Sequence, residues 1–387
     1  MANKEVVIGE NDKKIQFGLG TTLVIAAMVI VAVIIYRNFI MDQFYSSYKE
    51  IMTVAREDDG TTTYIPYGED MLLKYGRDGI TAIDAKGKKV WSASYDMKNP
   101  KAVVCDKSVA VADIENKQLV IFDEKGNAQN VEVVLPISQV YVSKQGIAAV
   151  VLEDDMAHYI KLCDEDTQYC EIKTRNKEDG YPISVAYSPD GKKLVTSYIH
   201  VTGEVTENMV TFYNMSDVGQ NYENEIVMAL DMGESMVPKV DFIDDENVII
   251  LSDNKFYIYN MKEIPYLVYE SKEYSQNIKS VSYDDEYVSV VTEDASTGKK
   301  TLTVFSVKGK KTGEASVDIE YDKMITSGKD TIFYSEKEIV IYTEKGNKKY
   351  NSIIEGNDFS AIQYNEKNMY YFIDEHNIKL IKLQKGE

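Results

Sequence analysis

The stretch LVIFDEKGN at residues 119–127 recurs almost unchanged as IVIYTEKGN at residues 339–347. In each, alternating apolar residues run into a Lys-Gly turn, which is the pattern of a β-strand that enters a hairpin. Related stretches follow one another at intervals of about forty residues, which indicates an internal repeat of eight units. They are ITAIDAKGK (80–88), LVIFDEKGN (119–127), YIKLCDEDT (159–167), VTFYNMSDVG (210–219), KFYIYNMKE (255–263), LTVFSVKGK (302–310), IVIYTEKGN (339–347) and IKLIKLQKG (378–386).

A second set of turns, such as SPDGKKLVT (188–196), alternates with the first. Each unit therefore holds four short strands, named a, b, c and d in chain order; the second set of turns connects a to b, and the Lys-Gly set connects c to d. Four strands in about forty residues match the strand number and length of one propeller blade. No unit contains a long stretch with the 3.6-residue period of a helix, which excludes helical repeats.

The two ends of the repeat region predict a closed ring. The eighth unit stops at QKGE (384–387), inside its c-to-d turn, and so lacks strand d. The first unit already has four strands between residues 62 and 95, yet the alternating stretch KEIMTVARE (49–57) precedes it. If this stretch supplies the missing strand, it covers an otherwise exposed sheet edge. We therefore predict an all-β fold, an eight-bladed β-propeller closed by an N-terminal strand; seven blades is the alternative if the first or fourth unit is irregular.

An uncharged segment precedes the propeller. Between Lys14 and Arg37 lie 22 residues, IQFGLGTTLVIAAMVIVAVIIY, which as a helix are long enough to cross a bilayer core. The run is longer than the apolar part of a signal peptide, and no small-residue cleavage site follows, which favours an uncleaved signal anchor. The expected organisation is a short cytoplasmic tail (1–14), one transmembrane α-helix (15–37), a juxtamembrane linker (38–48) and the propeller (49–387).

Charge and small residues bear on topology and partners. Three lysines precede the apolar span and few basic residues follow it closely, which favours a cytoplasmic N-terminus and an extracellular propeller.

The net charge of -20 and the lack of basic stripes argue against a nucleic-acid partner. Within the span, Gly18, Thr22 and Ala26 recur at every fourth position, a ridge of small residues that permits a helix-mediated dimer.

Three long connections are candidates for a binding face. Successive strands alternate in direction, so the b-to-c and d-to-a connections share one face of the ring, and we expect the long insertions on that face, turned away from the membrane. They are IHVTGEVTEN (199–208), SDVGQNYENE (216–225) and EDASTGKK (293–300). The candidate binding residues in them are His200, Glu204, Glu207, Asn208, Asn221 and Tyr222. The alternative is that these stretches are only longer hairpins.

The cysteines allow one bridge. Cys163 and Cys170 flank CDEDTQYC, and a hairpin centred on Asp166 and Thr167 would place them directly opposite each other, within disulfide reach. A bridge is therefore a candidate if this region is extracytoplasmic, with two free thiols as the equal alternative. Cys105 lies in an apolar run and is expected to be a small buried residue.

The chain shows no motif for catalysis, a metal or a cofactor. Its three histidines lie more than 40 residues apart, and no HExxH, paired-cysteine, G-x-S-x-G or P-loop pattern occurs. Acidic clusters such as Asp164 to Asp166 fall in predicted turns, where Asp is favoured for backbone reasons, and none fits a calcium loop. We therefore expect a non-enzymatic protein without a bound cofactor.

Two short motifs resemble known propeller families. SPDGKKLV (188–195) looks like the S-P-D-G-K turn of TolB-type and WD-like repeats, and AIDAKGKKVW (82–91) resembles the repeat of quinoprotein-like and BamB-like propellers. The second resemblance implies that Gly87 permits a turn and that Trp91 docks against the neighbouring blade; with a single Trp, a quinone cofactor is not expected. Over its whole length the chain is similar to an uncharacterised family of single-pass membrane proteins from Clostridia and related Gram-positive bacteria, which implies an architecture and a location but no activity.

The leading hypothesis is a membrane-anchored, extracytoplasmic propeller that binds an envelope protein, a membrane protein or a wall polymer without catalysis. The alternative is a glycan-binding or glycan-hydrolysing propeller with carboxylates at its centre, although no Asp-box repeat supports it. Binding of carbohydrate through tyrosines would require several of them on one exposed face; most tyrosines alternate within strands, which favours packing.

Overall fold

The computed structural model of the chain describes residues 28–31, 44–56, 62–274, 277–354, 358–364 and 366–385. It divides into two units, Met1–Phe44 and Tyr45–Glu387. The predicted membrane span and the ridge of small residues lie outside the described residues, apart from residues 28–31, which are helical. Among the residues that are described, no helix is both long enough and apolar enough to cross a bilayer.

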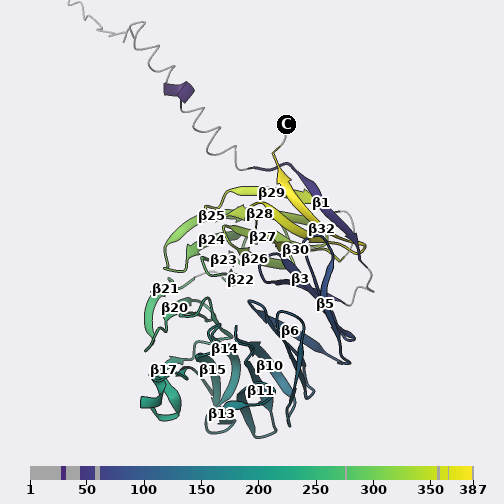
Figure 1. Cartoon of the computed structure of the whole chain (residues 1–387). Coiled ribbons are helices and arrows are strands. Elements are labelled where there is room, and N and C mark those ends of the chain that lie inside the picture. Colours follow the sequence, from purple (N-terminus) through teal and green to yellow (C-terminus); the bar gives the residue numbers. More distant parts are fainter. Residues whose placement is uncertain are drawn as a thin grey trace, which may run out of the picture. The chain divides into compact units, whose positions relative to one another are not determined.

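The second unit is a ring of eight four-stranded antiparallel sheets, seen in its described residues as blades around a common axis (Figure 1). Blades 1 to 4 consist of β2 (Thr63–Tyr67), β3 (Met71–Gly76), β4 (Gly79–Ile83) and β5 (Lys89–Ser94); β6 (Pro100–Cys105), β7 (Ser108–Asp113), β8 (Gln118–Phe122) and β9 (Ala128–Glu132); β10 (Ile137–Val142), β11 (Ala148–Glu153), β12 (Ala157–Cys163) and β13 (Gln168–Arg175); and β14 (Tyr181–Tyr187), β15 (Lys193–Thr202), β16 (Val205–Asn214) and β17 (Ile226–Gly233). Blades 5 to 8 consist of β18 (Lys239–Phe242), β19 (Asn247–Leu251), β20 (Phe256–Asn260) and β21 (Tyr266–Glu270); β22 (Asn277–Tyr283), β23 (Tyr287–Glu293), β24 (Lys300–Ser306) and β25 (Lys311–Val317); β26 (Lys323–Ser327), β27 (Asp330–Tyr334), β28 (Glu338–Thr343) and β29 (Lys348–Ile353); and β30 (Ser360–Gln363), β31 (Met369–Ile373), β32 (Asn377–Gln384) and β1 (Ser47–Ala55).

The eighth blade joins the two ends of the propeller. Its strand d is β1, which pairs antiparallel with β32, from Ser47 opposite Gln384 to Ala55 opposite Asn377. In Figure 1 the purple β1 therefore lies beside the yellow β32. The prediction of eight blades closed by an N-terminal strand is confirmed, and the seven-bladed alternative is excluded.

The repeated Lys-Gly stretch builds the same turn in blades 2 and 7. In blade 2, Oδ1 of Asp123 accepts hydrogen bonds from the backbone N–H groups of Lys125 and Asn127 at 2.8 and 2.9 Å. In blade 7, Oγ1 of Thr343 accepts the corresponding two bonds at 3.4 and 3.3 Å. The glycine after each lysine has a φ of +78° or +79°, which a residue with a side chain rarely adopts. The near-identical nine residues thus encode one turn, used twice.

The turn glycines also let neighbouring blades come close together. A Cβ atom on Gly126 of blade 2 would lie 2.6 Å from the ring of Trp91, which belongs to strand d of blade 1. Trp91 is buried and stacks on Phe122 of blade 2, with ring centroids 5.8 Å apart. Trp91 therefore docks against the neighbouring blade, as the quinoprotein-like resemblance implies. At the closure, a Cβ atom on Gly87 would collide with Val54 of β1, so the c-to-d turn of blade 1 packs on the closing strand in the same way.

The hydrophobic core lies between the blades rather than in one central cluster. Strands b and c are buried on both faces, as in β7 and β27, where every residue is buried. Each cluster of buried side chains joins two adjacent blades; one contains Ala110 and Leu119 of blade 2 with Val140 and Val150 of blade 3. The ring is consequently held together by blade-to-blade contacts, and grooves occur where such contacts are incomplete.

Candidate functional site

Four of the predicted binding residues lie on the hairpin of blade 4. Its strands β15 and β16 have ten residues each, longer than the other b and c strands of the propeller. His200 on β15 pairs with Glu207 on β16, Asn208 is the next residue on β16, and Glu204 lies in the b-to-c turn. The prediction of a long b-to-c connection is wrong here: residues 203 and 204 alone connect β15 to β16, so the stretch 199–208 is a longer hairpin, which was the alternative.

The stretch 216–225 lies elsewhere than predicted. It contains Asn221 and Tyr222 and two short 3-10 helices, η2 (Gly219–Asn221) and η3 (Glu223–Glu225), and it connects β16 to β17. A c-to-d connection belongs to the face opposite the b-to-c turns, so the prediction that all three insertions share one face is wrong. The stretch 293–300 connects β23 to β24 and is a b-to-c turn, as predicted.

A groove of ≈ 560 Å³ runs between strand β13 of blade 3 and the facing side of blade 4. We call it the blade 3–4 groove. His200, Glu207 and Asn208 line it from the hairpin, and Asn224 and Glu225 line it from the 216–225 insertion. Although the two stretches attach to opposite faces of the ring, the groove brings parts of both together. The predicted residues that do not line it are Glu204, Asn221 and Tyr222.

The blade 3–4 groove is strongly acidic. Its lining includes six carboxylates but one lysine, Lys173. Glu178 is paired with Arg175 at 2.5 Å, whereas Glu207 and Glu225 have no hydrogen bond or ion pair to another described side chain. The six carboxylates are Glu171, Glu178, Asp179, Glu207, Glu225 and Asp231. Since few cations neutralise them locally, the groove attracts positively charged groups.

The floor of this groove is polar and buried. The hydroxyl groups of Tyr198 and Tyr213 lie 3.0 Å apart and are hydrogen-bonded to each other. Burial raises the pKa of Tyr213 to about 12 and raises the pKa of Tyr198 well above its usual value, so both remain protonated at neutral pH. Asn208 is 1% exposed; its Oδ1 accepts a bond from the Val237 backbone N–H, while its Nδ2 has no partner among the described residues. The floor therefore offers hydroxyl and amide groups to a ligand.

The candidate disulfide is absent from the structure, in which Cys163 and Cys170 are both free. The predicted register is off by one residue: Cys170 pairs with Leu162, and a bulge separates that pair from Cys163 opposite Gln168. A shift of one residue turns a side chain to the other face of the sheet. Cys163 accordingly packs in the cluster between blades 2 and 3, and Cys170 in the one between blades 3 and 4. Burial raises the pKa of the Cys163 thiol to about 11. The thiol of Cys105, which is half-buried, also has its pKa raised by burial to about 11.

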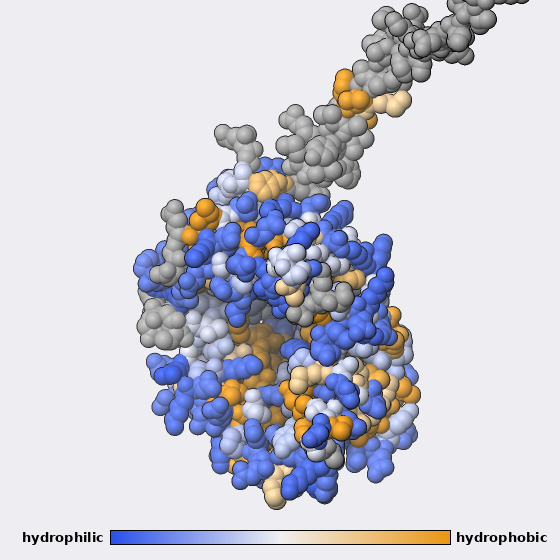
Figure 2. Space-filling model, turned by 180° about the vertical axis from the view of Figure 1, so that it is seen from behind, coloured by the Kyte–Doolittle hydropathy of each residue, from blue (hydrophilic) through white to orange (hydrophobic). Residues whose placement is uncertain are grey.

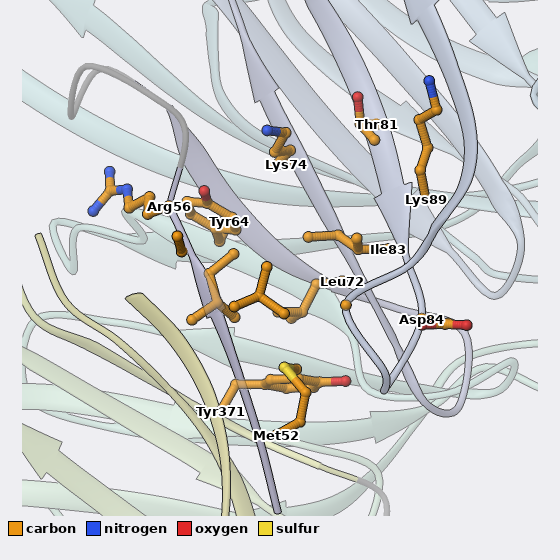
Figure 3. Close-up of a pocket in the computed structure, with 14 residues that line it drawn as sticks. Met52, Arg56, Tyr64, Leu72, Lys74, Thr81, Ile83, Asp84, Lys89 and Tyr371 are labelled. Carbon is orange, nitrogen blue, oxygen red and sulfur yellow. The ribbon is translucent and has the colours of Figure 1, made fainter. Parts of the chain in front are cut away.

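A second pocket, of ≈ 260 Å³, lies where the closing strand β1 meets blade 1 (Figure 3). We call it the seam pocket, and sequence reasoning missed it. Its apolar lining comes from β1, blade 1 and blade 8 and includes Met52, Val54, Leu72, Ile83, Tyr371 and Ile378. Its charged residues are Arg56, Lys74, Asp84 and Lys89, and hydroxyl groups belong to Thr81, Tyr64 and Tyr371. The sequence signal that could have revealed it is a pair of lysines, Lys74 and Lys89, within strands of the first unit. Both lie on a face that the closing strand covers only in part.

The centre of the ring is where the glycan-hydrolysing alternative expects carboxylates. Figure 2 shows a hydrophilic face that is hollowed in the middle, and the walls of the hollow are mainly hydrophobic. The described innermost strands contain one carboxylate, Asp241, which accepts a hydrogen bond from the Tyr283 hydroxyl at 2.7 Å and pairs with Lys239 at 3.0 Å. Glycoside hydrolysis ordinarily uses two carboxyl groups. In the part of the chain that is described, no group of His, Cys, Asp or Glu side chains is arranged to hold a metal ion.

Comparison with known proteins supports the propeller fold. BamB from Moraxella catarrhalis superposes with a TM-score of 0.56 over 87% of this chain and 100% of its own, at 12% identity. Sqt1 from Chaetomium thermophilum, in its complex with the N-terminus of the ribosomal protein L10, superposes with a TM-score of 0.55 over 87% and 100%, at 9% identity. At such identities these likenesses concern the fold alone. No curated protein matches the chain.

The sequence pattern of one protein family matches residues 41–383, which is nearly the whole propeller with its closing strand. This chain therefore belongs to that family, the family of unknown function DUF5711.

Proposed function

We propose that this protein is a membrane-anchored, extracytoplasmic propeller that binds a protein partner and catalyses no reaction. The anchor rests on the uncharged 22-residue run between Lys14 and Arg37. The binding role rests on the blade 3–4 groove, where two insertions of blade 4 meet beside unpaired carboxylates. An exposed groove on a rigid scaffold, bordered by a long hairpin and by a loop insertion, is a common form of binding site.

The partner segment that fits this groove is extended and carries lysine or arginine. Six carboxylates on the walls favour cationic side chains, while Met209 and Ile172 offer apolar surface to their aliphatic stems. Buried hydroxyl groups of Tyr198 and Tyr213 on the floor can accept bonds from an ammonium group. A propeller of similar shape, Sqt1, is bound to the N-terminus of a ribosomal protein, which supports a peptide segment as the occupant.

Binding of a fluorescent ten-residue peptide of alternating Lys and Ser to the full chain tests this proposal. We expect saturable binding that weakens with salt, because the contacts are between charges. Glu207→Gln/Glu225→Gln removes two unpaired carboxylates, one exposed and one half-buried, and is expected to weaken binding about fivefold, at up to about 1 kcal/mol for each charge. The control Glu336→Gln/Glu375→Gln makes the same change of net charge on blades 7 and 8. Equal affinities of the two double variants would exclude the groove as the site.

The location is tested in intact cells with a membrane-impermeant lysine reagent. The propeller carries most of the lysines, so we expect strong labelling of the full chain before lysis. Protection in intact cells together with labelling after lysis would contradict the extracytoplasmic assignment and direct the search to cytosolic partners.

A further inference from the structure

We infer that the seam pocket binds a small organic anion, with a carboxylate or phosphate group on an apolar body. The chain as a whole has 63 acidic and 43 basic residues, yet among the four charged residues of this pocket three are basic. They are Arg56, Lys74 and Lys89, against Asp84. A concave site lined by charges of one sign concentrates ligands of the opposite sign.

Two of these cations are available to a ligand. Lys74 on β3 lies directly opposite Thr81 on β4, so their side chains emerge about 5 Å apart on one face of blade 1. Lys89 joins them from β5. In Figure 3 the polar ends of the three side chains lie on the same side of Leu72 and Ile83. Within the described part of the chain, neither lysine ammonium nor the Thr81 hydroxyl forms a hydrogen bond or ion pair.

The other two charges are held in place by contacts of their own. The guanidinium of Arg56, whose side chain is 2% exposed, donates from Nη1 to Asp358 Oδ2 at 2.5 Å and to the Asp374 carbonyl at 3.1 Å. Asp84 accepts backbone N–H bonds within its own turn, which fixes its carboxylate there. Arg56 thus forms a fixed wall whose charge is offset by Asp358, the carboxylate of Asp84 is held by its own turn, and the two lysines supply the positive charge that is open to a ligand.

The apolar lining and the size of the pocket restrict the ligand. Side chains of Met52, Leu72 and Ile83, with the ring of Tyr371, form a surface below the polar groups in Figure 3. At ≈ 260 Å³ the pocket is smaller than the roughly 300–1,000 Å³ of sites for drug-sized molecules. A short alkyl or ring compound with one anionic group satisfies both the lining and the volume.

Occupancy of the seam pocket stabilises the closed ring. Its walls come from β1, from blade 1 and from β31 and β32, so a ligand contacts both ends of the propeller and its first blade at once. A molecule that binds only the closed state raises the unfolding temperature by mass action. This gives a readout that needs no knowledge of the natural ligand and does not depend on the blade 3–4 groove.

Thermal unfolding of the full chain with hexyl phosphate, inorganic phosphate or hexanol tests the inference. We expect a saturable rise in Tm with hexyl phosphate, about 2 °C at ten times its Kd, and smaller rises with the other two probes, because each lacks one half of the recognised chemistry. Lys74→Met/Lys89→Met is expected to abolish the rise. The control Lys125→Met/Lys337→Met makes an equal change of net charge at exposed positions and should keep it.

A second variant distinguishes a loss of ligand binding from a loss of folding. Thr81→Val keeps every charge and nearly the same shape, and it should raise the Kd for hexyl phosphate severalfold in a calorimetric titration. No saturable Tm rise in the unaltered protein, or the same rise in both double variants, would overturn the inference. A larger response to inorganic phosphate than to hexyl phosphate would overturn the apolar part of it.

Discussion

A variant that lacks residues 1–56 is expected to lose its cooperative unfolding transition, whereas one that lacks only residues 1–43 is expected to keep it. The longer deletion removes β1, the whole strand d of blade 8. It leaves the outer edge of β32 unpaired, uncovers the Gly87 turn that packs on Val54, and removes Arg56 from the face of Tyr64. The combined loss is expected to exceed about 5 kcal/mol, beyond nearly all single substitutions.

Circular dichroism during heating and size-exclusion chromatography measure the difference. The shorter deletion is the matched control, because it removes the uncharged run but keeps Tyr45, whose backbone N–H bonds to the Lys349 carbonyl. A synthetic peptide of residues 44–56 added to the longer deletion should restore part of the transition. If both deletions unfold cooperatively at the same temperature, β1 contributes little to closure and the eighth blade is stable with three strands.

Substitution of Lys349→Met is expected to cost about 3–5 kcal/mol of unfolding free energy, because it leaves a buried carboxylate without its cation. Lys349 Nζ donates to Asp330 Oδ2 at 2.6 Å and to the Tyr370 hydroxyl at 3.0 Å, and that hydroxyl donates to the same carboxylate oxygen at 2.6 Å. All three residues are buried where blade 7 meets blade 8. Burial raises the pKa of Tyr370 well above its usual value, which keeps the hydroxyl a donor. Urea unfolding at neutral pH measures the loss.

Two further variants separate charge from packing in this network. Asp330→Leu/Lys349→Met replaces both charges with apolar groups and is expected to recover most of the loss, since a buried ion pair contributes little net stability over an apolar pair. Lys107→Met breaks an exposed pair with Glu124 at 3.2 Å and should cost less than about 1 kcal/mol. A loss for Lys349→Met no larger than that for Lys107→Met would mean that the network is hydrated in solution.

The ring was predictable because its signals are local. In a turn such as DEKGN, an Asp side chain accepts bonds from the backbone and a glycine adopts a positive φ, so the turn can be recognised from its own residues. The turn glycines of blades 1, 2, 6 and 7 all have positive φ, and turns of this kind revealed the repeat. The closing strand could be identified because the first unit already has four strands and the alternating stretch KEIMTVARE (49–57) precedes it. Trp91 was assigned its packing role by one short resemblance, and the structure agrees.

The errors and omissions concern contacts that no local pattern records. A bulge beside Cys163 moves its hairpin by one residue, and nothing in CDEDTQYC distinguishes that register from the predicted one. The 216–225 insertion was placed on a face by its length, although the strand before it determines the face. The seam pocket beside Lys74 and the blade 3–4 groove beside Glu207 both exist because two adjacent blades do not cover each other completely. The fit between two blades depends on residues far apart in the chain, so no local sequence pattern predicts it.

The pairing of β1 with β32 also determines when, during synthesis of the chain, the ring can close. Roughly 330 residues separate the two strands, and at about 5–20 residues per second the ribosome needs roughly 20–70 s to synthesise these intervening residues. During that interval β1 has no partner for its backbone groups, while the first seven blades can form in order behind it. Because β32 is made after blades 1 to 7, β1 stays unpaired until then, and a chain that is halted before β32 keeps an open ring with an unpaired edge.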